Sequence, residues 1–326
     1  METVDGRISD KYLEHKEVSD FEEGRSLIFF KNISKEKKKL RDEIDMLNQI
    51  TMTEEHEEAL IPHETGVTSH LNRYCDILPY KHSAVSLDHK LKDEKDYINA
   101  NYIPGPFGED KLFVACQGPK SNTVKDFWRM VRQENILHII MLCRLTEGGR
   151  TKCEKYWPGA DESLKFEDIH LEVKSKGEKA ITDNLVERDF SLIDLSSNET
   201  ISEVKQVQYT GWPDHGIPEK DQFDDFDKLV QNTMEVYNTI KAEDSQKKML
   251  LHCSAGIGRT GTLLSIVHML AQLNEKEKAE VKPEKVSVFS VVRKLREHRF
   301  HLVQTDVQYY FIFEYLATHL KKLKLI

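Results

Sequence analysis

The sequence predicts an α/β fold in which one domain holds most of the chain. From about residue 70 onward, short apolar segments typical of buried strands alternate with longer segments whose apolar residues recur at helical spacing. A glycine-containing loop at 252–261 lies between a predicted strand and a predicted helix. No internal repeat, low-complexity tract or Pro/Gly/Ser-rich linker divides the 326 residues, and a chain of this length can bury one large core.

Composition excludes several classes of protein. Lys and Arg number 47 against 56 Asp and Glu, so the formal net charge is −9, and hydrophobic residues make up 39%. A chain of this composition can form a hydrophobic core. A general nucleic-acid binder needs clustered basic residues, and because the net charge here is negative we expect no nucleic-acid partner. Net charge does not exclude a local anion site, because it says nothing of the field at one point.

The sequence also indicates the cellular compartment of the protein. No segment approaches the roughly 18 consecutive apolar residues that a membrane span needs, and the polar N-terminus has no apolar signal core. The five cysteines are scattered and none is spaced C-x-x-C, which argues against a disulfide scaffold or a zinc ribbon. We therefore expect a reduced, cytoplasmic protein without a membrane span in this chain.

The N-terminal part is the most acidic. The first 60 residues carry 16 acidic and 10 basic side chains, which accounts for most of the net charge. Charge blocks at 35–39 and 54–58 are typical of a solvated helix face, with a regulatory or docking segment as the alternative. We predict a charged N-terminal extension over 1–44, partly helical or mobile, a compact domain over 45–320 and a short basic tail over 321–326.

The elements of the compact domain follow from apolar periodicity. Continuous apolar runs predict buried strands at 113–116, 136–145 and 249–251, and alternation over 166–173 predicts a half-exposed strand. Helical spacing predicts helices at 226–240, 260–273, 285–299 and 308–323, and a further helical stretch before residue 136 with Phe127, Met130 and Val131 on one face.

The loop HCSAGIGRTG at 252–261 contains a cysteine and an arginine separated by five residues. A tight loop that leads into a helix turns backbone N–H groups inward, and the helix N-terminus adds partial positive charge, so the segment can bind a phosphate-sized anion. Arg259 can close over that anion with a bidentate guanidinium, which lysine could not reproduce. Cys253 lies in the same positive field, which favours the reactive thiolate. The loop therefore places a nucleophile beneath a bound phosphorus.

Two other interpretations of this loop are weaker. Gly256, Gly258 and Gly261 match the G-x-G-x-x-G dinucleotide fingerprint, and a carboxylate follows at Glu275 or Glu277. A dinucleotide site has no use for a cysteine below the phosphate and an arginine six residues later, and this fingerprint lies late in the chain. A buried core thiol would not require the surrounding glycines and arginine.

Asp214 is the candidate general acid and base. It lies in WPDHGIP at 212–218, between two prolines and a glycine, so its loop can move as a stiff flap. A carboxyl group there could protonate a leaving phenolate oxygen and then take a proton from attacking water. Alone, the residue would be an ordinary turn aspartate, but the cysteine loop favours the catalytic interpretation.

Seven motifs in this chain occur in one order: NRY at 72–74, DYINA at 96–100, QGP at 117–119, KCEKYWP at 152–158, WPD at 212–214, the loop at 252–261 and QT at 304–305. In that order they resemble the classical, phosphotyrosine-specific protein tyrosine phosphatases over roughly residues 45–320. The resemblance implies a single α/β domain with a central, highly twisted mixed β-sheet flanked by helices. It also implies a protein-tyrosine-phosphatase, a hydrolase of signal transduction that needs no metal or other cofactor.

The resemblance assigns the chemistry. Cys253 attacks the phosphorus of phosphotyrosine and forms a cysteinyl-phosphate, while Arg259 and the loop amides hold the phosphate oxygens. Asp214 acts as acid and then as base. Gln304 positions the hydrolytic water, with Gln308 as a nearby second glutamine.

The resemblance also assigns supporting roles. His252 helps the thiol to ionise through the local hydrogen-bond network, and Thr260 stabilises the thiolate as it leaves. Trp212 belongs to the flap, Lys152 pairs with the flap aspartate, and Glu147 orients the loop arginine.

Tyr74 carries the implied substrate class. Its ring would line a deep cleft in which phosphotyrosine stacks, whereas phosphoserine is too short to reach the floor. Asp76 resembles the aspartate that holds the peptide backbone. The implied substrate-binding residues are Tyr74, Asp76, Asp214, Ser254, Ala255, Gly256, Ile257, Gly258, Arg259, Gln304 and Gln308.

The chain departs from its relatives at a few positions. Cys75 stands where many relatives carry a basic residue that favours acidic flanking sequence, so that preference is not expected here. Arg296 and Arg299 match basic positions that help to form a second phosphotyrosine site in some relatives. His301 is larger than the residue found where that site is open, so we expect the second site to be obstructed.

The leading prediction is an active phosphatase that acts on phosphotyrosine-containing proteins as a monomer. A catalytically inactive module that only binds phosphotyrosine is the alternative from another class, and a dual-specificity phosphatase is the alternative from the same class.

Overall fold

A nine-stranded mixed sheet forms the centre of the computed structural model, which describes residues 16–61, 68–88, 96–214, 216–243, 246–279 and 284–326. The strand order is β2-β3-β4-β12-β5-β11-β10-β9-β8. The four inner strands β4, β12, β5 and β11 run parallel, and the strands outside them pair antiparallel. The sheet is β2 (Ala84–Ser86), β3 (Tyr97–Ile103), β4 (Phe113–Cys116), β5 (Ile136–Met141), β8 (Ser163–Phe166), β9 (Leu171–Thr182), β10 (Leu185–Asp194), β11 (Glu199–Tyr209) and β12 (Lys248–His252).

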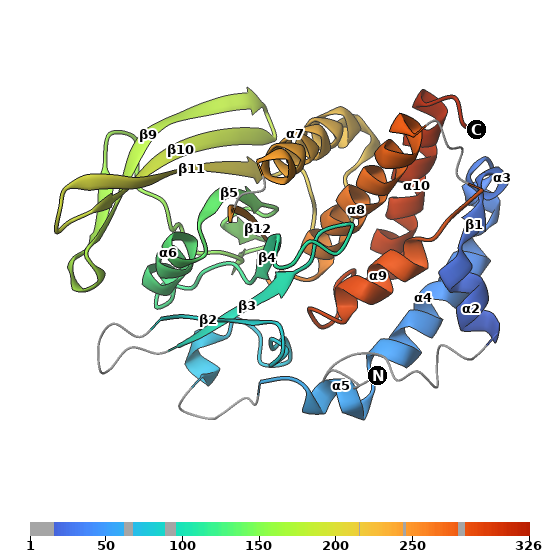
Figure 1. The fold of residues 1–326 in the computed structure, drawn as a ribbon, viewed down its shortest axis with the longest axis horizontal. Helices are drawn as coiled ribbons and strands as arrows, with labels where there is room; N and C mark the ends of the chain where they lie inside the picture. Colours follow the sequence, from blue (N-terminus) through green and yellow to red (C-terminus); the bar gives the residue numbers. More distant parts are fainter. Residues whose placement is uncertain (1–15, 62–67, 89–95, 215, 244–245, 280–283) are drawn as a thin grey trace.

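Helices cover both faces of the sheet (Figure 1), as the sequence predicts. Because side chains alternate along a strand, Phe113 and Ala115 of β4 join one apolar cluster while Val114 and Cys116 join the other. Helix α6 (Val124–Gln133) packs on the second face. The first face is covered by α7 (Phe223–Ala242), α8 (Gly258–Lys278), α9 (Val288–Arg296) and α10 (Asp306–Lys322).

The described N-terminal residues fold against the C-terminal helices, and the blue N-terminal helices lie beside α9 and α10 in Figure 1. Phe30 stacks on Phe313 with ring centroids 5.7 Å apart, and Phe21 packs on Phe289 at 5.2 Å. The predicted boundary near residue 45 stays a prediction, and residues 1–15 lie outside the described part. This segment comprises α2 (Lys16–Glu23), β1 (Arg25–Ser26), α3 (Leu27–Phe30), the 3-10 turn Ile33–Lys35, α4 (Lys37–Thr51) and α5 (Glu54–Glu58).

Short elements complete the described fold. Strand β1 pairs with β13 (Lys285–Val286), and β6 (Thr146–Glu147) forms a hairpin with β7 (Arg150–Thr151). Further 3-10 turns lie at Ser69–Leu71, Glu167–Ile169 and Lys220–Gln222. Among the described helices, none is long and apolar enough to cross a membrane.

Most predicted elements are confirmed, but three differ. The strand predicted at 136–145 ends at Met141. The helix predicted at 285–299 begins only at Val288, because a short strand precedes it, and ends at Arg296. The single strand predicted at 166–173 is wrong. A 3-10 turn interrupts it, and His170 follows with a left-handed φ of 51°, so two antiparallel strands form instead.

Candidate active site

The phosphate loop at 252–261 connects β12 to α8, as predicted. Three consecutive carbonyls of this loop are bonded on its outer side. The carbonyl of Ser254 accepts from the N–H of Gly118 at 2.8 Å, and Arg299 donates to the carbonyls of Ala255 and Gly256 at 2.9 and 2.8 Å. Because these carbonyls point outward, the amides of the loop are turned toward its centre.

Cys253 lies at the base of this loop and is buried. Its sulfur accepts a hydrogen bond from the N–H of Gly256 at 3.3 Å. Gly256 has a φ of +73°, and a Cβ on it would lie 2.0 Å from the carbonyl oxygen of Cys116. Only glycine therefore fits at this position of the loop.

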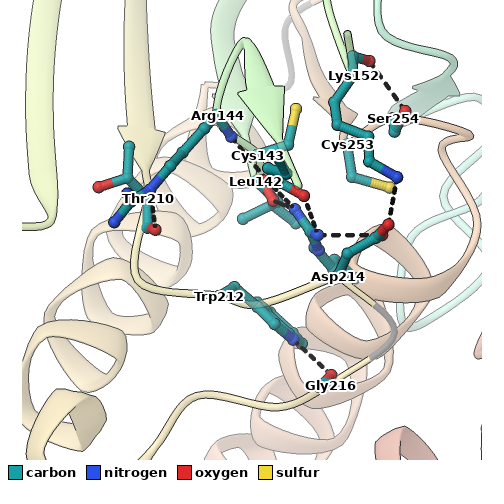
Figure 2. A network of polar contacts seen from close by, with 12 residues as sticks. Leu142, Cys143, Arg144, Lys152, Thr210, Trp212, Asp214, Gly216, Cys253 and Ser254 are labelled. Carbon is teal, nitrogen blue, oxygen red and sulfur yellow. Dashed lines mark hydrogen bonds and ion pairs between the residues drawn. The ribbon is translucent and has the colours of Figure 1, made fainter. Parts of the chain in front are cut away.

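Arg259, Glu147 and Asp214 form one charged network above the cysteine. The guanidinium of Arg259 donates to both carboxylate oxygens of Glu147 at 2.8 and 2.6 Å, and to Asp214 Oδ1 at 3.1 Å. Lys152 Nζ donates to the other oxygen of Asp214. Figure 2 shows Lys152 and Asp214 turned toward each other beside Cys253. The structure thus brings together the five residues predicted for nucleophile, acid, phosphate binding and their support.

The flap that carries Asp214 is anchored through Trp212. The indole is buried, packs edge-on against Phe226 at 5.2 Å, and donates from Nε1 to the carbonyl of Gly216 at 2.9 Å (Figure 2). Just after the end of β11, the carbonyl of Thr210 accepts a hydrogen bond from Arg144 at 3.1 Å. These contacts hold the chain on both sides of Asp214.

Gln304 and Gln308 lie directly over the phosphate loop. A Cβ placed on Gly258 would meet Gln308 Nε2 at 2.9 Å and Gln304 Oε1 at 3.2 Å. Thr305 begins α10 with a capping box whose partner is Gln308, and Gln308 Oε1 also accepts from the N–H of Gln304 at 3.1 Å. The cap therefore holds both glutamines against the loop.

His252 is buried and neutral, which refines the role that the resemblance implies. Nε2 lies 2.9 Å from the hydroxyl of Tyr156, and Nδ1 lies 3.1 Å from the carbonyl of Cys253. Burial lowers the pKa of His252 to about 4. The ring therefore carries no charge near pH 7, and its contact with Cys253 is the hydrogen bond to that carbonyl.

Some predicted residues lie behind the cleft wall and not on it. His252, Gly256, Ile257 and Thr260 are buried and do not line the cleft. The hydroxyl of Thr260 is buried and makes no hydrogen bond within the described part of the chain. The hydroxyl is therefore an unused hydrogen-bond donor at the end of the loop.

A cleft of about 1050 Å³ opens above the loop. Tyr74 forms one wall, and its hydroxyl lies 2.9 Å from the hydroxyl of Ser254. Asp76 lies at the same rim, whereas the neighbouring Cys75 is exposed and does not line the cleft. Other lining residues include those of the β6–β7 hairpin, Lys152, the flap, Ala255, Gly258, Gln304 and Gln308.

Two arginines that match a second phosphotyrosine site in some relatives are buried in this protein. The side chains of Arg296 and Arg299 are 1% and 0% exposed, and both bond to the protein's own carbonyls and amides. Arg299 also donates to Asn99 and Asn101, so it holds the phosphate loop from behind. Sequence reasoning missed this role, because an arginine in a predicted amphipathic helix gives no sign of burial. His301 is half-buried beside them, with Nε2 3.3 Å from the carbonyl of Gln304.

Arg73 is a second residue whose position the sequence alone did not reveal. Its guanidinium donates to the carbonyls of Gly118 at 3.1 Å, Thr151 at 3.2 Å and Pro119 at 2.6 Å. It therefore joins the segment of Tyr74 to the β7 edge of the cleft.

Among the described residues, no group of three His, Cys, Asp or Glu is arranged to hold a metal ion.

Comparison with known proteins identifies the family of this chain. A family model for protein-tyrosine phosphatase matches residues 68–318. The human receptor-type tyrosine-protein phosphatase eta is 39% identical over 241 residues, which cover 74% of this chain and 17% of that protein. The human tyrosine-protein phosphatase non-receptor type 12 is 37% identical over 255 residues, 77% of this chain and 30% of that protein. The chain belongs to the protein-tyrosine phosphatase family.

Solved structures give the same result. The catalytic domain of human protein tyrosine phosphatase non-receptor type 18 superposes with a TM-score of 0.74 at 29% identity, over 86% of this chain and 95% of that one. The same phosphatase in complex with HER2 phosphopeptides gives a TM-score of 0.73 over 86% of this chain and 92% of that one. The fold is thus that of a phosphatase catalytic domain, although this chain spans less than a third of the two curated relatives described above.

Proposed function

We propose that this protein hydrolyses phosphotyrosine in proteins through a cysteinyl-phosphate intermediate. The observation that carries the proposal is a thiol at the base of a ring of inward-turned amides, with Arg259 and Asp214 facing each other 3.1 Å apart above it. The arrangement supplies an anion site, a nucleophile and a carboxyl group in one cleft, which are the parts that phosphoryl transfer needs.

In the first step Cys253 attacks phosphorus. A bond forms between Sγ and phosphorus while the bond from phosphorus to the tyrosine oxygen breaks. Asp214 gives its proton to that oxygen, so the product leaves as neutral tyrosine. Arg259 and the loop amides stabilise the charge on the remaining phosphoryl oxygens, and Glu147 keeps the guanidinium oriented.

In the second step water hydrolyses the intermediate. Gln304 orients the water, Asp214 takes its proton, and the bond between phosphorus and sulfur breaks. The thiolate and inorganic phosphate are released. The unused hydroxyl of Thr260 can donate to the returning thiolate.

The depth of the cleft supports phosphotyrosine as the substrate. The thiol is buried beneath walls that include Tyr74 and the flap, so the phosphate must be carried by a long, flat side chain. A relative of the same fold binds HER2 phosphopeptides, which are ligands of this class. A dual-specificity phosphatase is tested against this proposal by comparing phosphotyrosine with phosphothreonine peptides of the same sequence.

Turnover of a small aryl phosphate, measured with and without a chelator, tests the proposal. We expect chelator-insensitive turnover, and Cys253→Ser should lower it at least about 10³-fold while phosphopeptide affinity is kept. No turnover by the folded protein would instead support the inactive phosphotyrosine-binding alternative. Loss of turnover on chelation would refute a mechanism built on these side chains alone.

Removal of the acid tests its assignment separately. Asp214→Ala should slow turnover of a phosphotyrosine peptide by about 10²-fold or more and trap the peptide on the enzyme, because binding does not need the carboxyl group. Unchanged turnover would show that another group donates the proton. Identification of proteins captured by this variant would give the physiological substrates.

The setting of the activity is also a proposal. All five cysteines are free and three besides Cys253 are buried, which suits the reducing cytoplasm. We propose a cytoplasmic catalytic unit in signal transduction that acts as a monomer without nucleic-acid partners. Light scattering at two protein concentrations tests the monomer.

A further inference from the structure

Arg296 donates hydrogen bonds to the backbone that leads to Gln304. It is the last residue of α9, and residues 297–303 connect that end of the helix to Gln304. Its Nε donates to the carbonyl of Leu302 at 2.8 Å, and its Nη2 donates to the carbonyl of Val303 at 2.7 Å. These are the two carbonyls immediately before Gln304.

The same guanidinium reaches the N-terminal segment. Its Nη1 donates to Asn48 Oδ1 at 2.9 Å and to Thr51 Oγ1 at 3.0 Å, both on α4. Because a guanidinium is planar and rigid, its position relative to α4 fixes the direction of the other two bonds. One side chain thus joins α4 to the loop of Gln304.

The loop needs this support because its backbone is strained. His301 and Val303 have φ of 60° and 62°, a left-handed conformation that a β-branched valine rarely adopts. On its other side, the N–H of Val303 donates to the carbonyl of Ile257 at 3.2 Å, and a Cβ on Gly261 would lie 2.4 Å from that nitrogen. The loop is therefore held between the phosphate loop and Arg296.

Burial of the Arg296 side chain also costs folding free energy. In the part of the chain that the structure describes, no carboxylate forms an ion pair with it, and burial lowers its pKa to about 10. A buried cation without a counter-ion is retained at a cost in stability. Arg296 is held by four hydrogen bonds to the loop and to α4, and not by an ion pair.

We propose that Arg296 is a positioning residue for hydrolysis of the cysteinyl-phosphate, anchored by Asn48 and Thr51 of α4. The inference rests on the function proposed above, in which Gln304 orients the water. Helix α4 precedes residues 68–318 that match the family, so the anchor lies outside the matched region. Because Arg296 directs its hydrogen bonds to α4 and to the loop of Gln304, formation of the intermediate at Cys253 should be spared.

The test uses a double variant and a matched control. Asn48→Ala combined with Thr51→Val removes both acceptors on α4 and leaves Arg296 in place. Arg41→Ala is the control, because it breaks the exposed ion pair of Arg41 with Asp306 at 3.3 Å, which also joins α4 to α10 but not to the loop. Arg296→Lys keeps the charge and loses the planar fork.

Each step is measured separately by rapid mixing with an aryl phosphate. Release of the aryl alcohol reports formation of the intermediate, and protein-bound phosphate in acid-quenched samples reports its hydrolysis. We expect hydrolysis to slow by about tenfold in the double variant and in Arg296→Lys, with formation changed less than about twofold, so that protein-bound phosphate accumulates. Arg41→Ala should match the unsubstituted protein.

Three results would separate the possibilities. Equal slowing of both steps, in parallel with a lower free energy of unfolding, would mean that Arg296 is only structural and would overturn the inference. Unchanged hydrolysis in the double variant would overturn it as well, even if Arg296→Lys fails to fold. No release of aryl alcohol by the unsubstituted protein would refute the proposed function itself.

Discussion

Gly256 is the residue at which the phosphate loop has least freedom. Its φ is +73°, and an added Cβ would lie only 2.0 Å from the carbonyl oxygen of Cys116, which leaves no room for a side chain. We expect Gly256→Ala to push the loop away from β4 and misdirect its amides. The predicted loss in kcat/KM for an aryl phosphate is about 10²-fold or more, since oriented amides dominate stabilisation of the transferred group.

Gly108→Ala is the matched control for this prediction. Gly108 also has a positive φ, +87°, but a Cβ there would meet nothing within 4 Å. Both substitutions therefore cost backbone strain, and only one disturbs the loop. Equal activity of the two variants would show that loop geometry at Gly256 does not limit phosphate binding.

The residues of the site differ in how visible they are in the sequence. Cys253, Arg259 and Asp214 are predictable because a local motif fixes each of them. The neutral state of His252 is not, because it follows from burial beneath Tyr156 and not from neighbours in the chain. The inward orientation of Arg299 depends on contacts with Ala255 and Gly256, more than 40 residues away, so no local pattern reveals it.

At the scale of elements, α3 shows that the charged N-terminal part contributes to the core. Phe30 is 1% exposed and stacks on Phe313 of α10. We expect Phe30→Ala to lower the free energy of unfolding by about 3–5 kcal/mol, because it leaves a cavity that its neighbours cannot fill. Urea unfolding followed by tryptophan fluorescence measures the change.

The control for Phe30 comes from the same helix. Ile28 is 72% exposed, so Ile28→Ala changes the helix without opening a cavity and should cost less than about 0.5 kcal/mol. Similar losses for both variants would contradict a structural role for this segment in the folded domain.

The elements also differ in how far the sequence predicts them. Strands β4 and β12 and helices α7, α8 and α10 carry continuous or helical apolar patterns, which are visible within a short window of sequence. The long hairpin of β10 and β11 is not predicted, because charged residues interrupt its exposed face and its pairing is defined by cross-strand register. Tertiary contacts decide such strands, and a single sequence does not display them.

At the scale of the whole molecule, several buried and half-buried histidines have lowered pKa values. Burial lowers the pKa of His252 and of His138 to about 4, and it also lowers the pKa of His268, His301 and His56. An unfolded chain would titrate these groups near about 6.5. Between these values, the unfolded state binds protons that the folded state does not.

The sign of the resulting pH dependence follows from this difference. Stability from a histidine with a lowered pKa is fully present above about pH 6.5 and is lost as the pH falls toward the folded value near 4. For His252 alone, the loss between pH 7 and pH 5 is about 2 kcal/mol. Glu43, whose pKa is raised by burial, opposes the trend, and so does the falling net negative charge, but the surface charges are screened by salt.

We therefore expect the free energy of unfolding, measured by urea titration in about 0.15 M salt, to decrease steadily from pH 7 to pH 5. His252→Gln should flatten that slope, and equal or greater stability at pH 5 would show that the histidines are not buried as the structure has them.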